Sequence, residues 1–252
     1  IGPGRMAEPM VIAEHLAGYF SRSASLESRR VLITAGPTHE PIDPVRFIAN
    51  HSSGKMGYAL AKEARDRGAR VTLISGPTSI AAPAGVDVVQ VITAQQMAAA
   101  VDAYSDDADI IIAAAAVADF TPIHTADQKL KRRQMTEAEM NIQLRPTRDI
   151  LRSVGERKRL DQVLVGFALE TEGLIESAQA KLVEKNCDLV IANPATEANA
   201  GFGTDTNRIT IVGHEIQREL PMMSKRECAA AILDAATQLL GTTRSTPPIP
   251  AP

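Results

Sequence analysis

Short apolar runs that alternate with helical patterns are the feature of this sequence that most restricts its fold. The runs rich in β-branched residues, which are candidate strands, cover residues 31–35, 71–75, 88–92, 110–116, 163–167, 189–193 and 208–212. Most are apolar at every position, as is typical of strands buried on both faces of a parallel sheet. The helical patterns cover residues 57–67, 94–104, 175–185 and 225–240. This alternation predicts an α/β fold with a doubly wound, mostly parallel, Rossmann-like sheet.

The two ends of the chain differ in composition from the middle. Residues 1–28 hold one short amphipathic stretch, 10–20, followed by a Ser/Arg-rich piece, and we expect them to be the end of a preceding domain and a linker. Residues 241–252 are rich in Pro and Thr and have little to bury, which predicts a disordered tail. The main domain is therefore predicted to run over residues 29–240.

Composition excludes several functional classes. Lys and Arg total 27 and Asp and Glu total 30, so the net charge of −3 argues against a surface that binds nucleic acid as a whole. Only 3% of the residues are aromatic, which leaves little for base stacking. No apolar run approaches the roughly 18–20 residues of a membrane span. Two distant cysteines, Cys187 and Cys228, exclude a disulfide scaffold and predict a cytoplasmic protein.

The loop that follows the first candidate strand is the strongest candidate for a binding site. It is polar, contains glycine and leads into a helix, whose free N–H groups and dipole favour an anion. Ser52, Ser53 and Gly54 could therefore bind phosphate. The loop matches neither the P-loop nor the G-x-G-x-x-G fingerprint. The second candidate strand ends in Ser75 and Gly76, where a ribose-binding acid would be expected, so a nicotinamide enzyme is disfavoured.

Three further patterns each have a functional and a structural interpretation. Residues 113–120 follow an apolar run and consist mostly of small side chains, with Asp119 near the end. Small side chains here would allow either a flat ring to lie on the backbone or a helix to pack tightly on the sheet. Residues 127–133 are basic and form either a mobile lid over a polyphosphate or a solvated loop. Lys181 and Lys185 share one helix face, which faces either a ligand or solvent.

Two other patterns carry little information. Tyr58 and Lys62 have the Y-x-x-x-K spacing of short-chain dehydrogenases but lie too early in the chain, so we interpret them as a partly exposed helix face. No histidine lies at metal-ligand spacing from a second ligand, and the sequence leaves the metal ligands unassigned.

Five segments in order resemble bacterial phosphopantothenate–cysteine ligase, also called phosphopantothenoylcysteine synthetase. They are VLITAGPTHEPIDPVRFIANHSSGKMG, AAAAVADF, DQKLKR, GFALET and DLVIANPATEANAGFGTDTN. The resemblance runs from about residue 31 to about residue 240. Residues 4–9, GRMAEP, look like the end of the decarboxylase domain that precedes the ligase in most bacteria. The resemblance thus implies the ligase part of a bifunctional protein, with too little of the decarboxylase present for an FMN site.

The resemblance also implies a reaction. The family condenses 4′-phosphopantothenate with L-cysteine in coenzyme A biosynthesis, using CTP in bacteria and Mg²⁺. CTP converts the substrate carboxylate to an acyl-cytidylate with loss of pyrophosphate, and the cysteine amine then displaces CMP. The family is dimeric, with sites completed near the subunit interface, so a homodimer is expected.

Residue roles follow from the positions that match the family's motifs. Asn50 and Arg46 would belong to the reaction centre, and Lys129 would steady the triphosphate from the K-x-K lid. The positions expected to bind the nucleotide are Ser52, Ser53, Gly54, Ala113, Ala114, Ala115, Asp119, Lys129, Asp149, Ile150, Phe167, Lys181 and Lys185. The family's Asn-Pro-Asp-Ile segment reads Thr-Arg-Asp-Ile over residues 147–150 here, which leaves Arg148 without an assigned role.

Two alternatives from other classes remain open. A nicotinamide-dependent oxidoreductase would need the missing glycine fingerprint and would bind NAD(P)H. A non-catalytic nucleotide-binding module would bind CTP without forming pyrophosphate.

Overall fold

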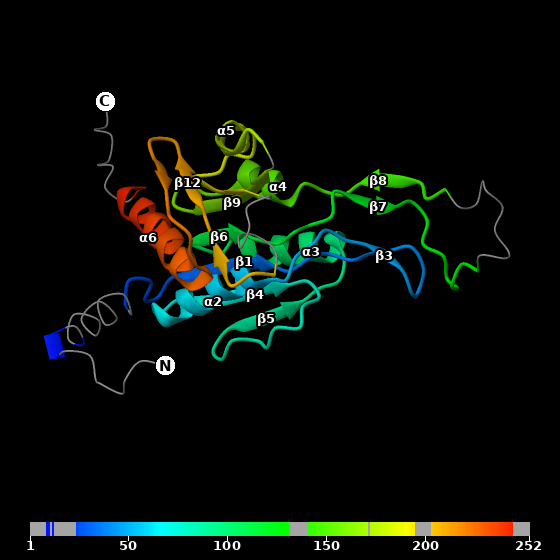
Figure 1. Ribbon diagram of the computed structural model, residues 1–252, viewed down its shortest axis with the longest axis horizontal. Helices are drawn as coiled ribbons and strands as arrows, with labels where there is room; N and C mark the ends of the chain where they lie inside the picture. The colour runs from blue at the N-terminus through cyan, green and yellow to red at the C-terminus, as the bar shows by residue number, and fades with distance from the viewer. Residues whose placement is uncertain are drawn as a thin grey trace, which may run out of the picture.

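An eight-stranded sheet forms the centre of the computed structural model, which describes residues 9–10, 12, 24–131, 141–170, 172–194 and 203–243 (Figure 1). The strand order is β13–β12–β10–β9–β6–β1–β4–β5. The strands span Arg30–Ala35 (β1), Arg70–Ser75 (β4), Asp87–Gln90 (β5), Ile110–Ala113 (β6), Val163–Glu170 (β9), Leu189–Pro194 (β10), Thr210–Gly213 (β12) and Gln217–Glu219 (β13). From β5 to β10 all neighbours are parallel, and β12 and β13 pair antiparallel. The predicted mostly parallel sheet is confirmed.

Helices cover both faces of this sheet. They are α2 (Lys55–Asp66), α3 (Ala94–Ser105), α4 (Ile150–Arg157), α5 (Leu174–Glu184) and α6 (Lys225–Thr243). Leu60 of α2 and Ile232 of α6 belong to one buried cluster with Ile33 of β1. Met97 of α3, with residues of α4 and α5, belongs to a second cluster around the adjacent Leu32. Because successive strand residues point to opposite faces, the two clusters are the two sides of a doubly wound sheet.

The order of the strands places a crevice beside β1. The chain runs from β1 outward to β4 and β5, then crosses back to β6 on the other side of β1. The loops after β1 and β6 therefore diverge at the carboxyl edge of the sheet. In open α/β sheets this switch point is where ligands bind.

Local signals set the ends of several helices. Thr93 caps α3 in a capping box with Gln96, as its position predicts. Gly68 follows α2 with φ +87°, the left-handed conformation expected there. α2 itself begins at Lys55, before the predicted start, and α6 continues through Thr243 into the segment expected to be a tail.

A two-part arm extends from the carboxyl edge of the sheet (Figure 1). We use "arm" for the pairs β2 (Glu40–Pro41) with β3 (Phe47–Ile48) and β7 (Phe120–Pro122) with β8 (Leu144–Pro146). The basic segment 127–133, expected to be a lid, lies between β7 and β8, and residues 132–140 lie outside the described residues. A further short pair, β11 (Thr206–Asn207) with β14 (Met223–Ser224), precedes α6.

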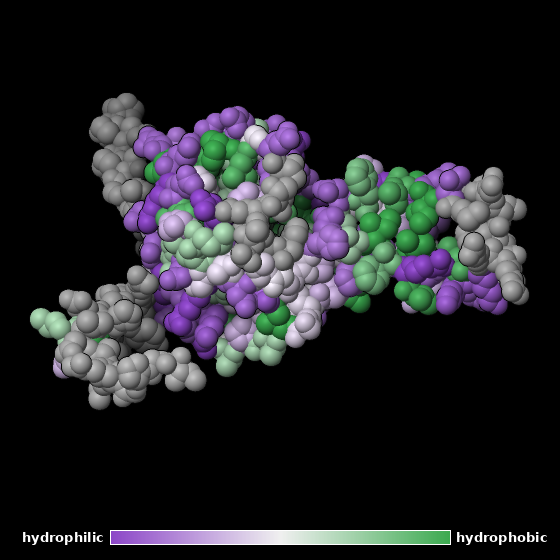
Figure 2. Space-filling model, viewed as in Figure 1, coloured by the Kyte–Doolittle hydropathy of each residue, from purple (hydrophilic) through white to green (hydrophobic). Residues whose placement is uncertain are grey.

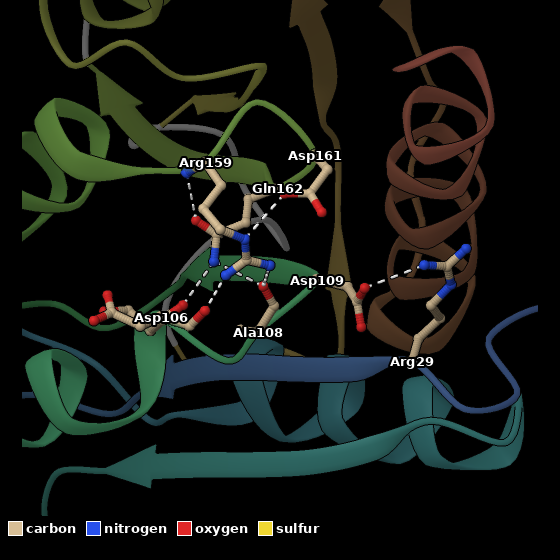
Figure 3. A network of polar contacts seen from close by, with 8 residues as sticks. Arg29, Asp106, Ala108, Asp109, Arg159, Asp161 and Gln162 are labelled. Carbon is tan, nitrogen blue, oxygen red and sulfur yellow. Dashed lines mark hydrogen bonds and ion pairs between the residues drawn. The ribbon is translucent and has the colours of Figure 1, made fainter. Parts of the chain in front are cut away.

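A polar network ties the amino ends of the strands together, at the edge opposite the crevice (Figure 3). The Asp109 carboxylate accepts hydrogen bonds from Arg29 Nη1 at 3.1 Å and from Arg30 N at 2.8 Å. Gln162 Nε2 donates to the carbonyls of Ser105 and Ala108. This edge is structural, because its polar side chains are occupied in holding β1, β6 and β9 in register.

Other expectations need correction. The strand expected over 110–116 ends at Ala113, and α4 and the short strand pairs were not expected at all. Tyr58 does not face solvent: it is buried against the end of β4, with its hydroxyl oxygen 3.0 Å from Ser75 Oγ. Leu26, ahead of the expected boundary at residue 29, is fully buried in the core. The stretch 10–20 lies almost wholly outside the described residues, as do residues 244–252. No helix in the described part of the chain is long and apolar enough to cross a membrane.

Candidate functional site

A cavity of about 870 Å³ opens at the carboxyl edge of the sheet, where the strand order reverses. Its walls come from the segments between β1 and α2, after β6 and between β8 and α4, from the carboxyl halves of β9 and β10, and from α2, α3, α4, α5 and α6. The predicted site residues that line it are Asn50, Ser52, Ser53, Gly54, Ala113, Ala114, Ala115, Asp119, Asp149, Ile150, Phe167, Lys181 and Lys185. Arg46 and Lys129 are the predicted site residues that the cavity wall does not include.

The start of α2 forms one wall of the cavity. Gly54 is its N-cap at φ +77°, with no side-chain cap, so the first N–H groups of the helix face the cavity region. A Cβ at Gly54 would lie 2.7 Å from Thr78 Cγ2, so glycine is required both by conformation and by space. Ser52 Oγ accepts from Gly54 N at 3.3 Å. The arrangement suits an anion.

The segment after β6 forms a second wall, made of small side chains. Asn50 Nδ2 donates to the Val117 carbonyl at 2.9 Å and ties the loop after β1 to this segment. Ala115 N donates to Thr34 Oγ1 at 3.2 Å. The short side chains leave the backbone open to a flat ligand, and Asp119 is exposed at the end of the segment.

Helix α5 and its C-cap bring two lysines to the cavity from the other face of the sheet. Lys181 Nζ donates to the Phe167 carbonyl at 2.9 Å, and Lys185 Nζ donates to Asp149 Oδ2 at 2.7 Å. Asp149 also caps α4 by accepting from Arg152 N. Burial raises the pKa of Asp149, but the hydrogen bonds from Lys185 and Arg152 N outweigh it and the pKa lies below its ordinary value. An ionised Asp149 therefore holds Lys185 in place.

Arg46 lies in the turn between β2 and β3, and it contacts the residue that follows Lys129; both Arg46 and Lys129 lie on the arm instead of in the cavity wall. The Arg46 guanidinium binds Asp43 Oδ2 and donates to the Leu130 carbonyl at 2.8 Å. Asp43 Oδ2 also accepts from Leu130 N at 3.1 Å, and its side chain has no exposed surface. The Arg46 side chain, with backbone N–H donors, holds the pKa of Asp43 far below its usual range. This cluster fixes the residue after Lys129 to the loop between β2 and β3.

Some cavity residues were missed by the sequence analysis. Lys55, Asn193 and Lys225 line the cavity, and Asn193 and Lys225 are almost fully buried. Lys55 directly follows the Ser-Ser-Gly motif and could have been included on that ground. Arg148, left unassigned, lines the cavity but turns its guanidinium to Asp102 of α3. The hydrogen bonds that Arg148 and Arg157 donate to Asp102 lower the pKa of that carboxyl group.

The described residues hold no group of three or more His, Cys, Asp or Glu side chains that could bind a metal ion. That finding is compatible with Mg²⁺, which commonly uses one or two carboxylates together with substrate phosphates. Asp119 is an exposed carboxylate in the cavity wall.

Comparison with known protein families shows which family the chain belongs to. The family model of the DNA/pantothenate metabolism flavoprotein C-terminal domain matches residues 26–240. The chain belongs to this family. Its fold is shared by the crystal structure of the C-terminal domain of the coenzyme A biosynthesis bifunctional protein CoaBC. That structure is 41% identical, with a TM-score of 0.74, and the match covers 87% of this chain and 100% of the other.

Curated relatives in this family are longer proteins. CoaBC of Bacillus subtilis is 47% identical over 245 residues, which are 95% of this chain and 59% of that protein. A cysteine/cysteine sulfinic acid decarboxylase from an unknown prokaryotic organism is 47% identical, over 92% of this chain and 66% of that protein. The chain thus spans about three fifths to two thirds of these relatives. The structure of a Cab2 mutant in complex with phosphopantothenate-cysteine shares the fold alone. It is 20% identical, with a TM-score of 0.70, and the match covers 95% of this chain and 97% of the other.

Proposed function

We propose that this chain is a ligase that condenses 4′-phosphopantothenate with L-cysteine, consuming CTP and releasing CMP and pyrophosphate. The observation that carries the proposal is the cavity at the switch point, which gathers residues from four of the five segments that match the ligase motifs. Membership of the family and 41% identity to a CoaBC C-terminal domain support it. The decarboxylase name of one relative describes a protein that extends well beyond this chain.

The chemistry requires activation of a carboxylate. An amine does not displace oxide at neutral pH, so the substrate carboxylate first attacks the α-phosphorus of CTP and pyrophosphate leaves. The cysteine amine then attacks the acyl carbon of the acyl-cytidylate, loses a proton and expels CMP. Both steps need positioned reactants and neutralised phosphate charge more than an acid–base residue.

Each wall of the cavity would serve one part of these reactants. The N–H groups at the start of α2, with Ser52 and Ser53, would bind phosphate oxygens. The small residues 113–115 and Asp119 would contact the nucleotide, and Lys181 and Lys185 would bind its charged part. Asn50, a neutral amide, would donate to the acyl oxygen without adding charge.

Mg²⁺ would fit this site as a partner of the nucleotide. The phosphates would supply most of its oxygen ligands, and Asp119 is the cavity carboxylate available to join them. When bound, the ion would neutralise charge on the triphosphate.

We further propose that the chain forms a homodimer through the arm. Large apolar side chains that are 43–52% exposed gather there: Phe47, Phe120, Ile123, Ile142 and Leu144. Figure 2 shows this apolar surface on the part of the molecule that projects from the sheet. Exposed patches of this kind commonly mark protein interfaces. Arg46 and Lys129 lie on the same arm, outside the cavity wall of their own subunit, and dimerisation through the arm would bring them near the cavity of the partner, in keeping with their proposed roles.

The word "bifunctional" in the name of the CoaBC relatives supports a second domain in a longer protein, and we propose that this domain is a decarboxylase. The two buried free thiols, Cys187 and Cys228, fit a reducing compartment, and we propose the cytoplasm.

A direct test is mass-spectrometric detection of product. The protein is incubated with CTP, Mg²⁺, 4′-phosphopantothenate and L-cysteine, and we expect phosphopantothenoylcysteine and CMP in equal amounts. Binding of CTP without any product would instead support a non-catalytic nucleotide-binding module.

A further inference from the structure

Two lysines outside the proposed nucleotide set border the same cavity. Lys55 begins α2 and Lys225 begins α6, so they come from neighbouring helices on one face of the sheet. Lys181 and Lys185 come from α5 and its C-cap on the other face. Only 7% of Lys225 is exposed. The cavity is therefore bordered by two separate pairs of lysines.

Both ammonium groups reach the same short backbone segment. Lys225 Nζ donates to the Thr204 carbonyl, and Lys55 Nζ donates to the Gly203 carbonyl at 2.8 Å. Lys55 also forms an ion pair with Asp205 at 2.7 Å. Segment 203–205 thus holds the two cations close together.

The two lysines differ in their surroundings. Burial lowers the pKa of Lys225, and the positive charge of Lys55 lowers it further, while Asp205 acts in the opposite direction. The Asp205 side chain is 89% exposed, so its ion pair with Lys55 is largely screened by water and readily exchanged. Two neighbouring ammonium groups in a cavity wall, one of them buried, create a site that an anion would stabilise.

We propose that Lys55 and Lys225 form a phosphoryl-binding subsite, in which a phosphoryl group takes the place of Asp205 at Lys55. The inference rests on the proposed function, which brings two phosphorylated reactants to the cavity. The phosphoryl group belongs either to the nucleotide triphosphate or to 4′-phosphopantothenate. The start of α2, with its uncapped N–H groups, lies directly beside Lys55 and adds donors.

Binding of separate ligands distinguishes the two sources. Calorimetric titration with inorganic pyrophosphate, CTP and 4′-phosphopantothenate is compared for the wild type, Lys55→Met and Lys225→Met. We expect both variants to bind the same reactant, either the nucleotide or 4′-phosphopantothenate, about tenfold more weakly than the wild type, because each loses one charge-assisted contact. Weaker binding of pyrophosphate and CTP assigns the subsite to the nucleotide, and weaker binding of phosphopantothenate assigns it to the substrate.

Three further variants separate binding from a structural role. Lys62→Met removes an exposed lysine of α2 outside the cavity and should leave all affinities unchanged. Lys225→Arg should restore most of the affinity that Lys225→Met loses. Asp205→Ala removes the competing carboxylate and should tighten the same ligand a few-fold.

The kinetic readout is the KM of that one substrate, which should rise in Lys55→Met while the KM for L-cysteine stays the same. Wild-type affinity in Lys55→Met, for all three ligands, overturns the subsite. The subsite is also overturned if Asp205→Ala binds the ligand more weakly than the wild type, because the lysines would then act only by anchoring segment 203–205. A wild-type protein that binds neither CTP nor phosphopantothenate contradicts the proposed function itself. If Lys225→Met does not fold, Lys55→Met carries the test.

Discussion

Asn50 lies where the loop after β1 meets the segment after β6, and its amide bridges them through the Val117 carbonyl. Asn50→Asp replaces the donor with a negative charge beside the proposed acyl group. We expect CTP affinity to change less than about threefold and the condensation rate to fall at least about tenfold, since one preorganised donor is lost. Titration with CTP and single-turnover kinetics measure the two effects.

Asn186→Asp is a matched control for this change, because Asn186 makes a similar amide-to-carbonyl bond to Gly155 and neither residue lines the cavity. Asn186→Asp should keep the wild-type turnover of correctly folded protein. Unchanged turnover in Asn50→Asp would remove Asn50 from the mechanism.

Asp43 is a positioning residue by the same reasoning. Its buried carboxylate joins Arg46 to Leu130, the neighbour of Lys129. Asp43→Asn keeps the shape but loses the charge that holds Arg46, and we expect kcat to fall several-fold at saturating CTP. Asp109→Asn, which also loses an arginine ion pair and changes a carboxylate that accepts from a backbone N–H, but lies at the opposite edge of the sheet, should have wild-type kcat. Equal losses in the two variants would show a general effect on stability.

The lowered pKa of Asp43 also predicts how stability depends on pH. A carboxyl group whose pKa is lower in the folded state stabilises the fold above its unfolded pKa of about 3.9, and loses that contribution as the pH falls toward the folded value. The difference in urea unfolding free energy between wild type and Asp43→Asn should stay constant from pH 8 to pH 5 and shrink below about pH 4. A difference that grows on acidification would contradict the assigned direction.

At the scale of elements, Thr93 and Gln96 form the capping box of α3, which packs beside the cavity through Met97. Thr93→Ala should lower the free energy of unfolding by about 1 kcal/mol, within the usual 0.5–2 kcal/mol for a lost N-cap. Urea denaturation measures this. No change in midpoint or slope would mean that the cap adds nothing to the packing of α3.

The central strands and the long helices could be predicted from the sequence because their signals are local. Apolar runs marked β1, β4 and β10, and Gly68 and Thr93 marked helix ends. The helix α4 was missed because it has only eight residues and shows two buried positions. The pairs in the arm were missed because strands of two or three residues form only where tertiary contacts bring them together. The strand over 110–116 was overextended because Ala114 and Ala115 leave the sheet to line the cavity.

The candidate site was predictable to the extent that its residues sit in recognisable motifs. Asn50 and Lys185 were found in this way. Lys225 was missed because a lysine at the start of a helix is ordinarily solvated, and only the fold brings it to Lys55, far away in the sequence. Arg46 was expected beside Asn50 and Lys129 over the triphosphate, but both lie outside the cavity wall, because the buried carboxylate of Asp43 ties Arg46 and the residue after Lys129 to the arm.

At the scale of the whole molecule, the exposed apolar arm predicts assembly. Leu144→Asp places a charge in the proposed interface and should convert a dimer to a monomer. Leu160→Asp is the matched control, since Leu160 is 96% exposed at a site away from the arm, and it should stay dimeric. Sedimentation velocity measures both, and a wild-type protein that stays monomeric at micromolar concentration would refute the proposed dimer.

The measurement that tests the central claim most directly is pyrophosphate release with 4′-phosphopantothenate and Mg²⁺. CTP is compared with ATP, each with and without L-cysteine. The proposed two-step ligase predicts release that requires phosphopantothenate, prefers CTP and reaches full turnover only with cysteine. Equal use of ATP would keep the ligase but contradict the nucleotide assignment. No release with either nucleotide, from folded protein that binds CTP, would contradict the ligase.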